Sequence, residues 1–133
     1  MTAPAYIEKM VASVLRSSKE ISDICGGKCN VFPLKIPQGA ELPAVVFQRI
    51  TSSPDYTLQG YSSEGVDIMI NCFALTYEKA KELALAVRKA MSAAPLNAIF
   101  DSERDLLNET GDVFCVNAEY KCQQTGGYCY GSE

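Results

Sequence analysis

Residues 42–91 constrain the fold more than any other part of the chain, because they combine strand and helix periodicity in a fixed order. Residues 44–51 and 65–75 alternate side chains with the period of two that strands require. The helix that follows from Thr76, a plausible N-cap, carries an apolar stripe made of Ala80, Leu83, Ala84, Val87 and Met91. This order predicts a sheet with a helix packed on it, a scaffold without an active-site motif.

The segment between the two strands, residues 52–64, is rich in Ser, Gly and Pro and carries too few apolar side chains for a core. Pro43 and Pro54 bracket the strand before it. We therefore predict an exposed connection here, and loops of this length in compact domains are usually functional or disordered.

The remaining segments complete an α+β architecture. Residues 3–19 have helical spacing, residues 30–36 predict a short edge strand because of Pro33 and Pro37, and residues 97–107 and 112–124 predict a hairpin. We expect a single domain over residues 1–133, with a mainly antiparallel sheet of four to five strands and two helices packed on one face. Residues 123–133 lack periodicity and predict a flexible C-terminal tail.

Composition restricts the function. Twelve basic and sixteen acidic residues give a net charge of -4, the wrong sign for a surface that binds nucleic acid through its phosphates. No apolar run approaches the roughly twenty residues that a membrane span needs. The N-terminus shows no secretory signal pattern, so we expect synthesis in the cytoplasm and no membrane association.

Six cysteines accompany a complete lack of histidine. Without histidine the commonest general base and the mixed Cys/His zinc sites are excluded, and no phosphate-binding glycine motif is present. Cys72 and Cys122 fall on the apolar parity of their strands and are expected in the core. A disulfide, if there is one, would involve Cys25 and Cys29, or Cys129 and a partner; a thiolate metal site is the other reading of these thiols.

One pattern of acidic residues is a candidate metal or acid–base site. Asp101, Glu103 and Asp105 would face one way on a regular strand, which suits metal or acid–base chemistry, but a solvated strand face has the same pattern. We therefore predict no catalytic residue, no bound metal and no cofactor.

Three segments carry a family likeness. They are "LPAVVFQRI" at residues 42–50, "GVDIMINCFA" at residues 65–74 and "YEKAKELALAVRKAM" at residues 77–91. Their order, with the N-terminal helix and the C-terminal hairpin, resembles the tail completion proteins of long-tailed bacteriophages, also described as tail terminator or head-tail joining proteins. The likeness rests on order and spacing over most of the chain, and the cysteines and the C-terminal tail are not part of it.

The resemblance implies a non-enzymatic virion protein of a phage or prophage, made in the host bacterial cytoplasm. Such a protein forms an oligomeric ring, commonly a hexamer, that caps the tail tube and joins it to the head connector. Its partners would be further copies of itself, the tail tube protein and the head connector protein, with DNA passing through the lumen without specific binding. The alternatives are another head-tail connector or minor capsid assembly protein, or a small α+β ligand-binding domain or enzyme.

Within that picture, the polar segment is the candidate contact surface. Aromatic residues are favoured anchors in protein interfaces. We expect this segment to contact a neighbouring subunit or the tube protein, through Pro54, Asp55, Tyr56, Leu58 and Tyr61.

Overall fold

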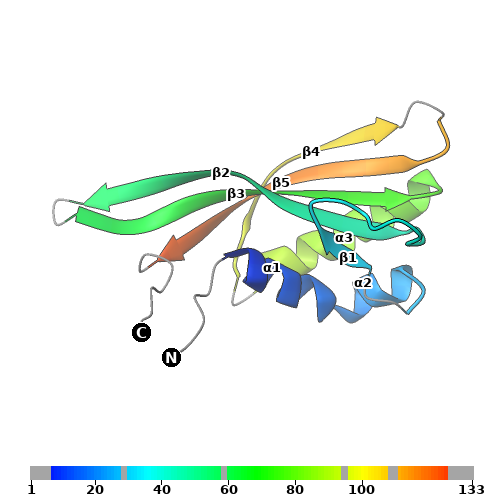
Figure 1. The fold of residues 1–133 in the computed structure, drawn as a ribbon, viewed down its shortest axis with the longest axis horizontal. Coiled ribbons are helices and arrows are strands. Elements are labelled where there is room, and N and C mark those ends of the chain that lie inside the picture. The colour runs from blue at the N-terminus through cyan, green and yellow to red at the C-terminus, as the bar shows by residue number, and fades with distance from the viewer. Residues whose placement is uncertain (1–6, 28–29, 58–59, 94–95, 108–110, 126–133) are drawn as a thin grey trace.

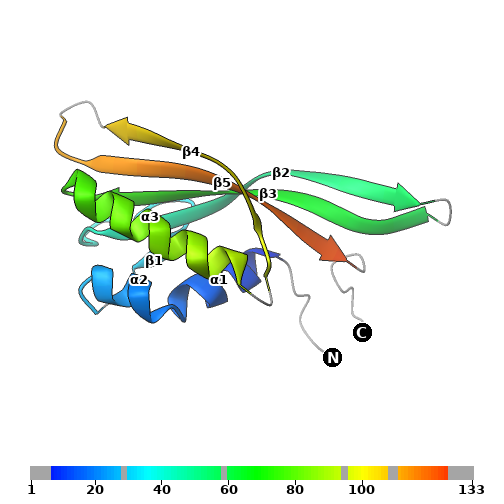
Figure 2. The same cartoon turned by 180° about the vertical axis from the view of Figure 1, so that it is seen from behind.

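A twisted mixed sheet runs through the molecule, and the helices lie together on one of its faces (Figures 1 and 2). The computed structural model describes residues 7–27, 30–57, 60–93, 96–107 and 111–125, with the backbone alone at 51–57, 60–64 and 123–125. The elements are, in chain order, α1 (Ile7–Arg16), α2 (Lys19–Ile24), β1 (Val31–Pro33), β2 (Ala44–Thr57), β3 (Gly60–Ala74), α3 (Tyr77–Ser92), β4 (Ile99–Leu107) and β5 (Phe114–Thr125).

The five strands are ordered β1-β2-β3-β5-β4. Only β1, the short edge strand that the prolines predicted, runs parallel to its neighbour; the other pairs are antiparallel. The predicted C-terminal hairpin is present as β4 and β5, which pair from Ile99↔Lys121 to Leu107↔Phe114. The α+β fold with a mainly antiparallel sheet is therefore confirmed.

The N-terminal helical segment is divided in two, where a single helix was predicted. Helix α1 ends at Arg16, and Ser18 starts α2 by accepting a hydrogen bond on its side chain from the Ile21 backbone N–H at 3.3 Å. The chain then turns at Gly26 and Gly27, whose φ angles of 78° and 84° suit glycine. Three helices of the described chain therefore pack on the sheet instead of two, and residues 3–6 of the predicted helix lie outside the described residues.

The core lies between the helices and one face of the sheet. Along β3, the residues at even positions from Val66 to Ala74 are buried, and the odd ones from Asp67 to Phe73 are partly exposed. Every member of the predicted α3 stripe is buried, and Thr76 caps the helix by accepting a bond from the Lys79 backbone N–H at 3.2 Å. Parity and helical spacing in residues 65–91 thus predicted both sides of this interface.

The segment at residues 52–64 is not a long loop. Strands β2 and β3 pair from Ala44↔Phe73 to Thr57↔Gly60, with register shifts between Arg49 and Thr51 and between Asp55 and Tyr56, and this ribbon projects well past the helices (Figure 1). Pro54 lies inside β2 instead of ending it. Strand β1 pairs only with Val45 to Phe47, so β2 is an edge strand at Pro54. A proline is tolerated on such an edge, and a ribbon with both faces outside the core needs no apolar alternation.

The ribbon is partly a three-stranded extension. Strand β5 follows β3 as far as Ser63↔Thr125, beyond the end of its pairing with β4. The strand thus includes residues 123–125 of the predicted tail, and residues 126–133 lie outside the described part of the chain.

Candidate assembly surfaces

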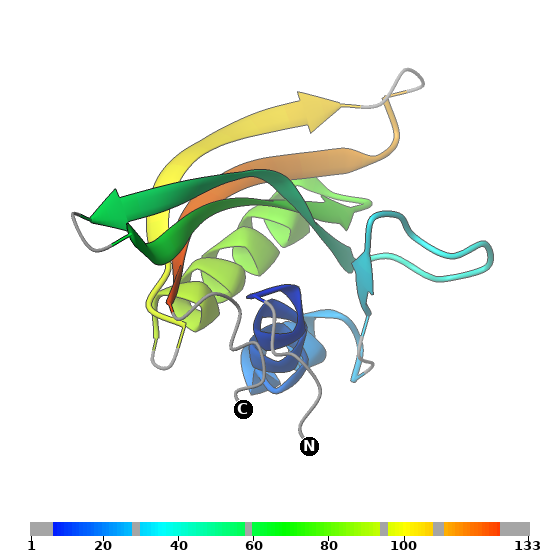
Figure 3. The same cartoon turned by 60° about the vertical axis from the view of Figure 1, so that its left-hand side comes forward.

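The face of the sheet opposite the helices carries a ladder of polar side chains across three strands. Asn117 on β5 donates from Nδ2 to Oδ1 of Asn71 on β3 at 2.6 Å, and its own Oδ1 accepts from Nε of Arg104 on β4 at 3.3 Å. Asn117 is 5% exposed although no helix of the described residues covers this face (Figure 3). Its side chain bonds to a neighbour on each side, so it ties β5 both to β3 and to β4.

Ion pairs extend the ladder along the open face. Lys121 on β5 pairs with Asp67 on β3 at 3.3 Å, and Arg104 pairs with Glu119 at 3.5 Å. Cations and carboxylates therefore alternate across these strands. The surface presents neither the basic stripe that nucleic acid requires nor a cluster of like charges.

An apolar pocket of about 370 Å³ adjoins the ladder on the same face. Its lining includes Met69 and Phe73 of β3, Leu106 and Leu107 of β4, and Val113. Leu106 and Leu107 are 48% and 57% exposed, so this end of the sheet presents apolar side chains to its surroundings. The alternation of residues along β3 predicted that Met69 and Phe73 lie on the face away from the core. The rest of the pocket lining comes from β4, and its position depends on the pairing of β4 with β5.

The predicted contact residues lie on the projecting ribbon. Register places Tyr56 opposite Tyr61, with Asp55 opposite Ser63 and Pro54 opposite Glu64. The structure thus brings the backbone of four of the five predicted residues together near the tip. The fifth, Leu58, lies outside the described residues.

The three carboxylates of β4 do not form one site. A register shift between Phe100 and Ser102 interrupts the alternation, so that Asp101 is the extra residue of a bulge. Beyond the bulge, Glu103 and Asp105 both pair with Lys81 of α3, at 3.4 Å and 2.8 Å. The expectation that all three share a face was therefore wrong, because the bulge changes the strand's parity.

These β4 carboxylates secure the helix to the sheet edge. Arg88 of α3 pairs with Glu103 at 2.9 Å and lies 3.8 Å over the ring of Phe100. Hydrogen bonds from Lys81 and then from the Tyr77 hydroxyl lower the pKa of the Asp105 carboxyl below its ordinary value. Their contacts are those of structural ion pairs.

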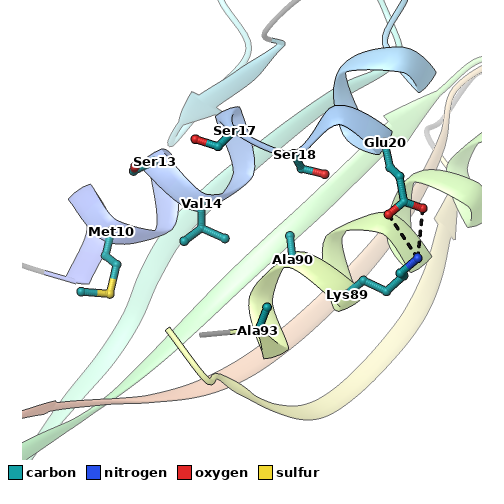
Figure 4. Close-up of a pocket in the computed structure, with 9 residues that line it drawn as sticks. All are labelled: Met10, Ser13, Val14, Ser17, Ser18, Glu20, Lys89, Ala90 and Ala93. Atoms are coloured by element: carbon teal, nitrogen blue, oxygen red, sulfur yellow. Dashed lines mark hydrogen bonds and ion pairs between the residues drawn. The ribbon is translucent and has the colours of Figure 1, made fainter. Parts of the chain in front are cut away.

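A groove of about 520 Å³ separates α1 from α3 (Figure 4). Its floor is apolar, with Met10 and Val14 facing Ala90 and Ala93, and the ion pair of Glu20 with Lys89 at 3.2 Å lies at one end. Ser13 of α1 and Ser17 and Ser18, which follow that helix, line it, but the sequence contains no histidine to activate them. The side chains that line the groove are apolar groups, serines and one ion pair, an arrangement typical of a gap between packed helices.

Four cysteines of the described residues are buried, namely Cys25, Cys72, Cys115 and Cys122. The core positions predicted for Cys72 and Cys122 are confirmed. Burial raises the pKa of Cys115 and of Cys122 to about 11, which keeps both thiols protonated and unreactive at neutral pH. Cys29 and Cys129 lie outside the described residues, so the suggested disulfides stay predictions.

The described residues hold no group of three or more His, Cys, Asp or Glu side chains arranged to bind a metal ion. Among the helices that the structure describes, none has the length and hydropathy to cross a membrane.

Comparison with known proteins first concerns the fold. The fold matches a chain from a solved structure titled "Virion of native gene transfer agent (GTA) particle", with a TM-score of 0.66, 17% identity, and coverage of 87% of this chain and 92% of that chain. No curated protein sequence matches. The two chains therefore share a fold.

The family follows from the sequence. The model of the family described as "Tail completion protein gp17" matches residues 9–120, and the chain belongs to this family. The resemblance inferred from residues 42–91 is thus confirmed. The protein is a structural protein of a phage tail and a component of the virion.

Proposed function

We propose that this chain assembles as a closed ring, commonly of six copies, which caps the tail tube and joins it to the head connector while DNA passes through the lumen. The observation that carries the proposal is the β2–β3 ribbon, paired from Ala44↔Phe73 to Thr57↔Gly60 and projecting past the helical layer (Figure 1). A ribbon that projects past the helices of the described residues is an arm suited to reach a neighbour.

The ribbon tip is the proposed contact with the adjacent subunit or the tube protein. Tyr56 and Tyr61 are opposite each other there, and Pro54, Asp55 and Leu58 complete the predicted set. Tyrosine provides a large amphipathic contact area, which favours it in interfaces. The outer edge of β2 beyond Phe47, where β1 has ended, also offers backbone groups to a further strand.

A structural role without catalysis agrees with the surfaces. The charged side chains of the open face are paired across strands, and the chain carries a net charge of -4. An acidic ring would repel phosphate and let DNA slide through without adhering. We therefore propose a non-enzymatic protein whose partners are its own copies, the tube protein and the connector protein.

The decisive test shortens the ribbon in register. Replacing residues 54–64 by Asn-Gly joins Ser53 to its cross-strand partner Gly65 through a two-residue turn and leaves the helix-covered body intact. We expect the variant to fold, as judged by circular dichroism and thermal unfolding, but to leave tails unjoined in a phage deleted for the gene. Leu85→Ser, at an exposed position of α3, is the matched control and should restore infectious particles.

Two outcomes contradict the proposal in different ways. A normal yield of particles with the shortened ribbon would show that the ribbon tip is not the contact surface. The ring itself would be contradicted if the protein stayed as single copies both at high concentration in solution and on purified tails. Mass measurement and negative-stain electron microscopy would show this.

A further inference from the structure

Strand β2 contains a β-bulge near the start of the projecting ribbon. Arg49 pairs with Ile68 of β3, and Thr51 pairs with Asp67, the adjacent residue of β3, so Ile50 is an extra residue of β2. The side chain of Ile50 is 40% exposed and is not part of the core cluster. A bulge of this kind bends its strand and increases the local right-handed twist.

Strand β4 contains a bulge at nearly the same height of the sheet. Phe100 pairs with Tyr120 of β5, and Ser102 pairs with Glu119, so Asp101 is the extra residue, and it is also exposed. Between the two bulged strands, β3 and β5 pair along their shared length without a register shift. The inner strands are therefore regular, and each of their outer neighbours is longer by one residue.

The two bulges border one row of the sheet, which we call the bulge row. Arg49 of β2, Ile68 of β3, Tyr120 of β5 and Phe100 of β4 are paired in succession and form it. The extra residue of β2 adjoins the row on the side of the ribbon tip, and the extra residue of β4 adjoins it on the opposite side. Figures 1 and 2 show the strands crossing over one another near the middle of the sheet, between the helix-covered end and the ribbon. Bulges placed across a sheet in this way curve it.

Charged side chains fix both ends of the bulge row to the helices. At the β2 end, Arg49 pairs at 2.7 Å with Glu8 in the first turn of α1, and both side chains are less than a third exposed. At the β4 end, the guanidinium of Arg88 from α3 lies 3.8 Å from the centre of the Phe100 ring and pairs with Glu103 at 2.9 Å. Charge-assisted hydrogen bonds are the strong ones in proteins, so a different helix holds each end of the row.

The middle of the bulge row is buried, and polar atoms there lack partners. Ile68 and Tyr120 are 0% and 1% exposed. The hydroxyl of Tyr120 and Nε of Arg88 are buried without a hydrogen-bond partner among the described residues. Native structures retain few such groups, because burying them unpaired costs free energy. Their presence indicates a geometry that is kept at the expense of stability.

We propose that the bulge row sets the direction of the β2–β3 ribbon. In this proposal Ile50 and Asp101 bend the sheet across the row, and Glu8 and Arg88 hold the bend, so that the ribbon tip is aimed at its assembly contact. The inference rests on the proposed function, in which the ribbon is the contact arm. It adds that the angle of the ribbon, and not only its presence, decides whether a subunit joins its neighbours.

Distance measurements on the full-length protein test the bend. Spin labels are attached through p-acetylphenylalanine at position 63 of the ribbon and at position 85, an exposed leucine of α3. Each labelled protein is diluted with an excess of unlabelled protein of the same sequence, so that distances between copies do not contribute. Pulsed electron resonance then gives the distribution of distances between ribbon and body. A second pair at positions 85 and 107, both exposed and away from the ribbon, is the control.

Deletion of either extra residue removes one bulge. Without Ile50 or without Asp101, the pairs that flank the bulge become consecutive and every other pair keeps its register. We expect each deletion to shift the mean 63–85 distance by several ångströms and to leave the 85–107 distance unchanged. In a phage deleted for the gene, each deletion variant should lose most of the yield of joined particles.

Point substitutions release the row without removing a residue. Glu8→Ala and Arg88→Met each remove an ion pair between a helix and the row or its neighbouring strand residue, and should widen the 63–85 distance distribution. Lys121→Ala is the matched control. It removes the ion pair with Asp67 in the next row, on the open face, and should leave the width unchanged.

Three results would overturn the proposal. An unchanged 63–85 distance in a folded deletion variant would show that the bulges do not set the direction of the ribbon. If neither deletion variant folds, an unchanged width in both Glu8→Ala and Arg88→Met would show that the helices do not hold it. A shifted distance with a normal yield of particles would break the link between direction and joining. The ribbon contact itself fails on a different result, a normal yield with the shortened ribbon, so failure of one proposal is distinguishable from failure of the other.

Discussion

The two faces of the sheet are built from alternate residues of the same strands, but they show opposite surface chemistry. On β3, Ile68 and Ile70 are completely buried against the helices, whereas Met69 and Asn71, which alternate with them along the strand, are partly exposed on the open face. The helix-covered face supplies apolar burial, the main favourable term in folding. The open face supplies directional bonds and an apolar pocket, which favour specific pairing and docking.

The comparison separates stability from assembly within one strand. A residue facing the helices should affect unfolding, and its neighbour on the strand should affect mainly what the subunit binds. The following substitutions test that separation, from the largest expected effect on stability to the smallest.

Ile68→Ala and Met69→Ala form the first matched pair. Ile68→Ala should lower the free energy of unfolding by about 2–5 kcal/mol. The substitution leaves a cavity in the core, and the surrounding side chains fill such a cavity only in part. Met69→Ala should cost well under half as much. Denaturant titration with both variants measures the difference, and equal losses would contradict the division between the two faces.

Asn117→Ala should give the largest loss on the open face, about 1–3 kcal/mol, because Asn71 and Arg104 both lose a bonding partner. The double variant Asn71→Ala/Asn117→Ala should lose less than the sum of the single losses. Additive losses in a double-mutant cycle would show that the ladder is not a coupled network.

Thr76→Ala removes the N-cap of α3, the helix that covers the core face. We expect a loss of about 1 kcal/mol in the free energy of unfolding, since the Lys79 backbone N–H loses its acceptor. Thr76→Ser keeps a hydroxyl at this position and should retain most of the stability. An equal loss in both variants would mean that the threonine methyl group, and not the cap, is responsible.

Asp105→Asn should have the smallest effect and a definite pH dependence. The pKa of Asp105 is lowered by hydrogen bonds from Lys81 and then Tyr77, so its contribution is present above its unfolded pKa and is lost as the pH falls. The difference in Tm between wild type and variant should be positive at pH 7 and shrink toward zero as the pH falls below the ordinary carboxyl pKa and then through the lowered pKa of Asp105. A difference that grows in acid would reverse the sign of this interaction.

Sequence alone predicted the helix-covered face well, because burial on one side imposes alternation on β3 and a stripe on α3. It failed where that constraint is lifted. The ribbon at residues 52–64 has no core to face, so strands there carry no apolar period, and the bulge at Asp101 shifts parity without a sequence signal. Ser17 and Ser18 gave the only local cue to the division between α1 and α2, since serine favours N-caps.

The candidate surfaces were predictable only in part. The ribbon residues were chosen for their aromatic content, which composition shows, but their pairing is set by register. The pocket near Leu106 and Leu107 was missed, because the placement of β4 beside β5 is a property of the folded chain. Whether the ribbon tip is a contact stays a prediction.

The most direct test of the account is electron cryomicroscopy of the head-tail junction in particles that carry this chain. The account predicts a closed ring of copies between the tube and the connector, with each β2–β3 ribbon in contact with a neighbour. Density for the chain elsewhere in the particle, or as separate copies that do not touch, would contradict it.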